Sequence, residues 1–264
     1  MSSLPLAGRR VLVTRAAHQA GKLSEGLRSL GAEPVEVPVL EIRPPLNFEP
    51  LDHALRQLGR YDWLILTSAN TVRGLTGRAA ELGIGLEPPS TMKVAAVGDA
   101  TAAAARKAGF AVDLVPESYV AESLLEGLAG SVSGQRVLLA RAEIARDVIP
   151  NVLRQAGAQV TVVDAYRNIM PESAPHELRR ALAAGIDVAT FTSSSSASHL
   201  AEAARAAGIE FPFAGVAAVS IGPVTSQTLR QLGWEPVAEA SVSDIPGLID
   251  AVVSVLQLLS ETKR

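Results

Sequence analysis

Cysteine is absent from the 264-residue sequence, and its absence removes several kinds of chemistry. Disulfides, cysteine-ligated iron–sulfur clusters and a thiolate nucleophile are all excluded. The four histidines lie far apart in the sequence, so we expect no metal site. Aromatic residues make up only 4% of the chain, which is too little to build a platform for stacking bases or sugars.

An excess of positive charge is also missing. The 24 lysines and arginines are outnumbered by 27 aspartates and glutamates, and the formal net charge is −3. Such a chain has no overall attraction for nucleic acid or for an anionic membrane surface. No segment approaches the roughly 20 consecutive apolar residues of a transmembrane helix, and the first residues lack the pattern of a secretory signal. We therefore expect a cytoplasmic protein with no nucleic-acid and no membrane partner, in which any anion site is local.

Small aliphatic residues are abundant instead, in a chain that is 48% hydrophobic. This composition is typical of helices packed closely on a parallel sheet. Apolar runs alternate with amphipathic segments, and we expect an α/β fold because strands separated by single helices form a right-handed parallel sheet. The pattern predicts strands at 10–14, 61–67, 93–97, 111–115, 136–140 and 159–165, and helices at 18–30, 51–59, 69–82, 99–108, 120–129 and 145–156.

The chain is an internal duplication. Residues 62–101 recur as residues 187–225, at an offset of 125 (187 − 62) that falls to 124 (222 − 98) at the second glycine turn. Residues 11–42 recur as residues 137–168 at a constant offset of 126 (137 − 11). One unit of about half the chain has thus been duplicated, which is too few copies for a solenoid.

Proline-rich breaks follow equivalent positions in the two copies, and they suggest that one domain is inserted into the other. We expect two similar parallel-sheet domains with helices on both faces, joined by a two-stranded linker that forms a hinge. The inner domain would be 44–164, the outer domain 1–36 plus 172–264, and the linker strands 37–43 and 165–171, with residues 43–50 read as irregular. A simple split near residue 130 is the alternative.

Polar residues follow the predicted strands in both copies. Ser68, Asn70, Ser193 and Thr225 are of the types that cap helices, and helix N-termini at the carboxyl ends of parallel strands attract anions. One such residue alone would be only a cap. Four paired turns predict a shared anion-binding cleft, to which Arg15 and Arg141 would add positive charge after equivalent strands.

Six motifs occur in order along the chain: VLVTR at 11–15, LTSAN at 66–70, AVGDAT at 96–101, VVDAYRN at 162–168, FTSSSSA at 191–197 and SIGPVTSQTL at 220–229. Together they resemble the uroporphyrinogen-III synthase family over essentially the whole chain. The resemblance implies a bilobal protein that cyclises linear hydroxymethylbilane, eliminates water and inverts the last pyrrole ring without a cofactor. It also implies hydroxymethylbilane synthase as a candidate upstream partner, and we expect a monomer.

Tyr166 is the candidate catalytic residue, because the resemblance places it in the family's site and because its counterpart at the offset of 126 is Leu40. A phenol is protonated at neutral pH and can act as a general acid. Strand alternation places it on one face with Val162 and Asp164. A tyrosine that ties a linker to the backbone is the alternative. The substrate-binding candidates are Arg15, Ser68, Ala69, Asn70, Gly98, Thr101, Arg141, Ser193, Ser194, Ser195, Gly222, Val224 and Thr225.

Two other classes of function are alternatives to a cyclising enzyme of this family. A non-enzymatic small-molecule binding or sensor protein could have the same bilobal architecture. A dinucleotide enzyme would need a G-x-G-x-x-G turn after a strand, and the first turn here reads TRAAHQAGK. The phosphate loop is therefore missing where that function requires it.

Overall fold

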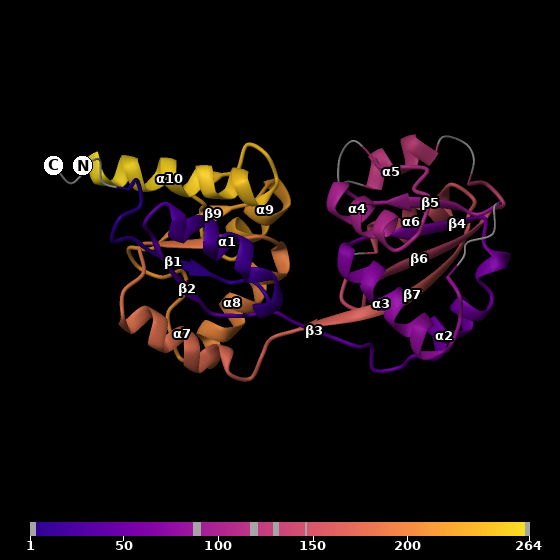
Figure 1. The fold of residues 1–264 in the computed structure, drawn as a ribbon, viewed down its shortest axis with the longest axis horizontal. Helices are drawn as coiled ribbons and strands as arrows, with labels where there is room; N and C mark the ends of the chain where they lie inside the picture. The colour runs from indigo at the N-terminus through magenta and orange to yellow at the C-terminus, as the bar shows by residue number, and fades with distance from the viewer. Residues whose placement is uncertain (1–3, 87–90, 117–120, 129–131, 146, 262–264) are drawn as a thin grey trace. The chain divides into compact units, whose positions relative to one another are not determined.

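The chain folds into two compact units in the computed structural model, which describes residues 4–86, 91–116, 121–128, 132–145 and 147–261 (Figure 1). Unit 1 consists of Met1–Glu41 and Ile169–Arg264, and unit 2 consists of Ile42–Asn168. Each unit is an α/β structure with a parallel sheet. The chain changes unit within both segments that the sequence suggested as linkers.

Unit 1 is built on a five-stranded sheet in the order β10-β9-β8-β1-β2. Its strands are β1 (Arg10–Val13), β2 (Glu33–Glu36), β8 (Val188–Phe191), β9 (Ala217–Ser220) and β10 (Ala238–Glu239), and neighbouring strands run parallel. Its helices are α1 (Ala17–Ser29), α7 (Ala174–Ala183), α8 (Ser194–Ala206), α9 (Pro223–Gln231) and α10 (Ile245–Glu261).

Unit 2 is built on a sheet in the order β3-β7-β6-β4-β5. Its strands are β3 (Glu41–Arg43), β4 (Trp63–Leu66), β5 (Lys93–Ala96), β6 (Arg136–Ala142) and β7 (Gln159–Ile169). Its helices are α2 (Glu49–Arg56), the short 3₁₀ helix η1 (Leu58–Arg60), α3 (Ala69–Glu81), α4 (Asp99–Lys107), α5 (Ala121–Leu128) and α6 (Val148–Gln155).

The two sheets are equivalent strand by strand. Strands β1 and β2 match β6 and β7 at the offset of 126 (136 − 10), while β8 matches β4 at 125 (188 − 63) and β9 matches β5 at 124 (217 − 93). Each unit therefore combines segments from both copies of the duplicated sequence. The order β9-β8-β1-β2 in unit 1 is the order β5-β4-β6-β7 in unit 2.

Helices cover both faces of each sheet. In unit 1, residues of α7, α8 and α9 fill one hydrophobic cluster, and residues of α1 and α10 fill the cluster on the opposite face. In unit 2, α2, α3 and α4 pack on one face and α5 and α6 on the other. Burial on both faces explains why β4, β8 and β9 are buried at every residue and do not alternate.

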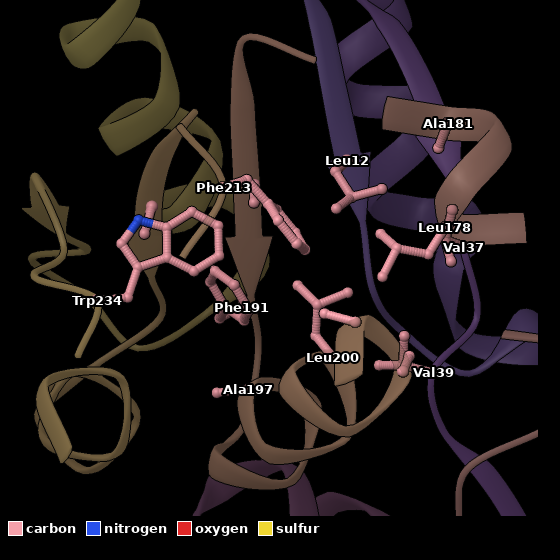
Figure 2. Packing of buried hydrophobic residues seen from close by; sticks show 14 of the residues in the cluster. Leu12, Val37, Val39, Leu178, Ala181, Phe191, Ala197, Leu200, Phe213 and Trp234 are labelled. Carbon is pink, nitrogen blue, oxygen red and sulfur yellow. The ribbon is translucent and has the colours of Figure 1, made fainter. Parts of the chain in front are cut away.

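The first cluster of unit 1 shows how the two copies share a core (Figure 2). Leu12, Val37 and Val39 come from the first copy and pack with side chains of the second. Trp234 lies edge-on to Phe191 at 5.5 Å between ring centroids. Since Val37 and Val39 are fully buried here, this part of the predicted linker 37–43 belongs to the body of unit 1.

Two sequence predictions differ from the structure. Residues 111–115 do not form a strand, and Leu114 makes only an isolated bridge to Ala95. Backbone hydrogen bonds join Asp113 and Leu114 to Val94 and Ala96, while the Asp113 carboxylate accepts the Val94 N–H at 2.8 Å, which a longer backbone ladder would use. The helix expected at 51–59 begins at Glu49, since Pro50 suits a first helical turn. The helices expected at 120–129 and 145–156 are α5 and α6, while residues 120, 129 and 146 lie outside the described part of the chain.

Candidate active site

The carboxyl ends of four parallel strands meet at one edge of the unit 2 sheet. Strand β4 leads into α3 at Ser68, and β5 leads into α4 at Gly98. Strands β6 and β7 continue further, to Arg141 and Tyr166. The register brings β4, β6 and β7 side by side, so residues far apart in sequence share this edge (Figure 1).

Tyr166 and Ser68 are in contact at this edge. The phenol oxygen lies 3.1 Å from the Ser68 hydroxyl, and either oxygen can donate the hydrogen. Ser68 is the N-cap of α3, and its Oγ accepts the Thr71 N–H at 3.1 Å. The tyrosine is only 7% exposed, so little of its ring faces solvent. The cap prediction for Ser68 is confirmed.

A bulge in β7 sets the position of the phenol. The register shifts between Arg141 and Ala142, which pair with Asp164 and Tyr166, and it leaves Ala165 without a partner. Ala165 and Tyr166 are consequently both buried. Alternation with Val162 and Asp164 therefore does not extend to Tyr166, because a bulge adds one residue to the strand and re-aims the side chain that follows.

Gly74 allows α3 to approach β7 closely at the same place. A Cβ on Gly74 would lie 2.3 Å from the Ala165 carbonyl oxygen, which is far inside contact distance. A helix with any side chain here would be held further from the strand. The contact between Ser68 and Tyr166 therefore depends on a glycine in the second turn of α3.

Asn70 and Ala69 occupy the first turn of α3 and are half-buried. Asn70 is not the cap, because Ser68 holds that position; its amide oxygen accepts a hydrogen bond from the Arg73 guanidinium. This places a cation beside the N-terminus of α3. Anions favour such a terminus, where the first N–H groups have no partner within the helix.

The second turn of unit 2 begins at Gly98, the N-cap of α4. Its backbone has φ 94° and ψ 153°, a conformation that side chains disfavour. Thr101 lies in the first turn of α4 and is 4% exposed. Its duplicated partner Thr225 is also 4% exposed, in the first turn of α9 behind the N-cap Gly222. Thr225 is thus not a cap, and neither threonine presents much surface to a ligand.

The equivalent edge of unit 1 is tied together by serines. Ser193 caps α8 in a capping box with Ser196, which confirms the cap prediction for Ser193. The Ser194 hydroxyl donates to the Val224 carbonyl at 3.2 Å and accepts from Thr228 at 2.9 Å. The N-termini of α8 and α9 are therefore joined, with Ser195 half-buried and Val224 exposed beside them.

The duplicated arginines differ in their surroundings. Arg141 forms an ion pair with Asp147 at 2.8 Å, so its charge is partly neutralised within unit 2. Arg15 lies beyond the end of β1, and its buried Nε has no hydrogen-bond partner among the described residues. Burial lowers the pKa of Arg15 from its ordinary value, although a guanidinium remains charged at neutral pH. Each unit therefore carries one of the duplicated arginines near its strand ends.

Sequence reasoning did not identify Thr71 and Gly74 as parts of this site. Thr71 is completely buried, and its hydroxyl lies 3.0 Å from the Ser68 hydroxyl. Its position three residues after the cap resembles the capping-box pattern, which could have indicated it. The contact of Gly74 with a strand more than 90 residues away gives no local sequence signal.

No group of three or more histidine or acidic side chains suited to a metal ion occurs in the described parts of the chain. Within the same residues, no helix has the length and apolar character needed to cross a membrane. The site is instead made of hydroxyl groups, helix N-termini and arginines.

Fold and site together define an α/β protein of two duplicated parallel-sheet units, with capped helix N-termini at the strand ends of each. A family model described as uroporphyrinogen-III synthase HemD matches residues 21–250. The chain is 36% identical to the uroporphyrinogen-III synthase of Synechococcus elongatus over 96% of this chain and 97% of that protein. It belongs to the uroporphyrinogen-III synthase family.

Two solved structures share the fold. A uroporphyrinogen III synthase of Thermus thermophilus matches with a TM-score of 0.69 and 22% identity, covering 95% of this chain and 99% of that one. The uroporphyrinogen-III synthetase of Helicobacter pylori matches with a TM-score of 0.59 and 18% identity, covering 94% and 99%. The α/β architecture of two sheet-containing units is therefore that of these enzymes.

Proposed function

We propose that this protein is a cofactor-independent, water-eliminating lyase that cyclises hydroxymethylbilane to uroporphyrinogen III. The observation that carries the proposal at the level of residues is the 3.1 Å contact between Tyr166 and the N-cap of α3. It places a proton donor beside a helix terminus that favours anions. Family membership supports the reaction class, and this contact supports Tyr166 as the candidate acid.

Substrate binding is assigned to the strand-end turns. Hydroxymethylbilane carries eight carboxylates, and the N-termini of α3, α4 and α8 offer N–H groups without helical partners. At α9, which begins with Pro223, the Val224 N–H is the corresponding group. Arg15 and Arg141 would add charge-assisted hydrogen bonds. The remaining contacts would come from Ser68, Ala69, Asn70, Gly98, Ser193, Ser194, Ser195, Gly222 and Val224. The burial of Thr101 and Thr225 leaves them a supporting role in the first turns of α4 and α9.

In the proposed reaction, Tyr166 donates its phenolic proton to the hydroxyl group of the substrate as the carbon–oxygen bond breaks. Water leaves with the bonding electrons, and the neighbouring pyrrole stabilises the resulting carbocation. The substituted α carbon of the last pyrrole attacks this carbocation, and the bond from the same carbon to its original methylene bridge breaks with its electrons returning to that pyrrole. The released methylene cation is then attacked by the unsubstituted α carbon of the last ring, and the proton lost from that carbon returns to the phenolate. Atoms balance, because one substrate gives one macrocycle and one water.

Positioning supplies the rest of the catalysis. The substrate must be folded so that the last ring is attacked at its substituted carbon, which inverts that ring. Hydrogen bonds from several helix termini can hold a flexible chain in such a shape. We further propose that the protein acts as a cytoplasmic monomer and receives its substrate from hydroxymethylbilane synthase.

One experiment tests the function directly. Purified protein is added to freshly generated hydroxymethylbilane, and the type I and type III isomers are separated after oxidation. We expect the type III isomer in excess over a heat-inactivated control, in which spontaneous closure gives type I. A product ratio equal to that of the control would refute the enzymatic function and favour a binding protein.

A further inference from the structure

A row of hydroxyl groups lies behind the phenol of Tyr166 in unit 2. Ser68 Oγ is 3.1 Å from the phenol oxygen and 3.0 Å from Thr71 Oγ1. Thr71 Oγ1 is in turn 3.4 Å from Thr67 Oγ1, which donates to the Ala140 carbonyl at 3.2 Å. The row thus runs from the phenol to a backbone acceptor on β6.

The direction of these hydrogen bonds follows from counting donors. Each hydroxyl has one hydrogen and two lone pairs. Ser68 Oγ already accepts the Thr71 N–H, so one lone pair remains. If the phenol donates to that lone pair, the Ser68 hydrogen points to Thr71 Oγ1 and the Thr71 hydrogen points to Thr67. Every hydrogen then has an acceptor.

The row can also point the other way. If the phenol hydrogen is given to a ligand, Ser68 turns its own hydrogen toward the phenol oxygen. The lone pair that this frees on Ser68 accepts the Thr71 hydroxyl, so two hydrogens change direction and no oxygen has to move. In this second arrangement the phenol oxygen receives a hydrogen bond, which stabilises negative charge on it.

We infer that Ser68 and Thr71 are positioning residues that direct the proton of Tyr166 toward the substrate and then stabilise the phenolate. The inference rests on the proposed function, because it needs Tyr166 to act as an acid. Thr71 is 0% exposed and cannot touch a substrate, so any effect of its hydroxyl on turnover passes through Ser68 and Tyr166.

Unit 1 has an equivalent serine cap, but its residues differ from those that form the reversible row of hydroxyl groups in unit 2. At the offset of 125, Ser193 and Ser196 replace Ser68 and Thr71. At the offset of 126, Leu40 occupies the place of Tyr166. Ser196 Oγ donates to the Ser193 carbonyl at 2.7 Å, so its hydrogen is fixed on the backbone. The reversible row is a property of unit 2.

The test is Thr71→Val, which keeps the shape of the side chain and the backbone N–H but removes the hydroxyl. We expect kcat to fall about 3- to 10-fold, the range of one net hydrogen bond, with KM unchanged. Thr71→Ser should restore kcat. Thr76→Val is the matched control on the same helix and should keep wild-type kcat, because the Thr76 hydroxyl donates to the α3 backbone carbonyls of Val72 and Arg73.

A double-mutant cycle tests whether the effect of the Thr71 hydroxyl on kcat passes through Tyr166. In a Tyr166→Phe background, Thr71→Val should change kcat no further, since the group it serves is gone. Wild-type kcat in Thr71→Val, or an equal loss with and without the phenol, would overturn the inference. Wild-type kcat in Tyr166→Phe would instead refute the acid role itself. If Thr71→Val does not fold, Thr71→Ala is measured by the same criteria.

Discussion

The contact between a helix and a strand end differs between the two units at equivalent positions. In unit 2, Gly74 of α3 faces the Ala165 carbonyl, and a Cβ would lie only 2.3 Å from that oxygen. In unit 1 the equivalent positions are His199 and Val39, and the His199 ring nitrogen Nδ1 lies 3.1 Å from the Val39 carbonyl oxygen. In unit 2 the helix backbone lies close to the strand because Gly74 has no side chain. In unit 1 the His199 side chain connects the helix to the strand.

This difference explains why only one unit carries the candidate acid. Close approach of α3 to β7 brings the helix cap to the residue that follows Ala165, which is Tyr166. The residue after Val39 is Leu40, which packs against the core of unit 1. Both copies of the duplication therefore have helix N-termini at their strand ends, while a glycine, a bulge and a phenol distinguish unit 2.

The largest expected effect on stability is the difference between alanine substitutions at Gly98 and at Gly222, the N-caps of α4 and α9. Gly98→Ala should destabilise the protein by about 2–3 kcal/mol, because alanine disfavours its φ of 94° with ψ of 153°. Gly222→Ala should cost less than about 1 kcal/mol. Its φ of 170° is extended backbone, and the added Cβ meets only the movable Ser243 hydroxyl at 2.6 Å. Thermal unfolding of both variants checks the order, and equal losses would contradict it.

The next largest loss of stability is expected from a substitution at Gly74, where α3 contacts β7. Gly74→Ala should destabilise by about 1–2 kcal/mol, because overpacking against the Ala165 backbone outweighs the better helix propensity of alanine. It should also reduce turnover by moving Ser68 away from Tyr166. Gly77→Ala is the matched control: no atom lies within 4 Å of its added Cβ, so it should stabilise α3 slightly. A Gly74→Ala variant as stable and active as Gly77→Ala would show that the close approach is unimportant.

A smaller effect concerns the packing of α2 on α3. Arg78 binds both carboxylate oxygens of Asp52 at 2.7 Å, and this hydrogen bonding lowers the pKa of Asp52. The counterpart of Arg78 in unit 1 is the buried Ala203. A lowered pKa in the folded state adds stability above the unfolded pKa, about 3.9 for aspartate, and the gain is lost as the pH falls through the folded value.

Asp52→Asn should therefore lower the melting temperature at pH 7 and leave a smaller difference from wild type near pH 3. Urea or thermal unfolding at both pH values measures this. A difference that is the same at pH 7 and pH 3 would contradict a role for the charge. Glu235→Gln serves as a control, because its pair with Arg230 is largely exposed in unit 1.

Sequence periodicity was sufficient for the parts of the fold that local rules determine. Buried apolar runs located β4 and β6, and serines that follow strands located the N-caps of α3 and α8. The offset of 126 indicated that Tyr166 and Leu40 differ within a common frame. These features depend on neighbours along the chain.

Features that depend on residues far apart in the sequence could not be predicted from local sequence patterns. The bulge at Ala165 exists only through pairing with β6, and it changed the direction of Tyr166. The contact of Ser68 with Tyr166 joins residues 98 positions apart. Residues 111–115 contact the sheet through an isolated bridge at Leu114, where the Asp113 carboxylate accepts the N–H of Val94 on another strand. The candidate residues could be predicted, but their contacts could not.

The measurement that tests the account most directly is the turnover of Tyr166→Phe with hydroxymethylbilane, compared with Tyr61→Phe. The substitution keeps the ring and removes only the proton donor. Because the substrate also loses its hydroxyl spontaneously, we expect a fall of about 10²-fold or somewhat less, with an unchanged melting temperature and wild-type turnover in Tyr61→Phe. Wild-type turnover in Tyr166→Phe would contradict the claim that the phenol is the acid.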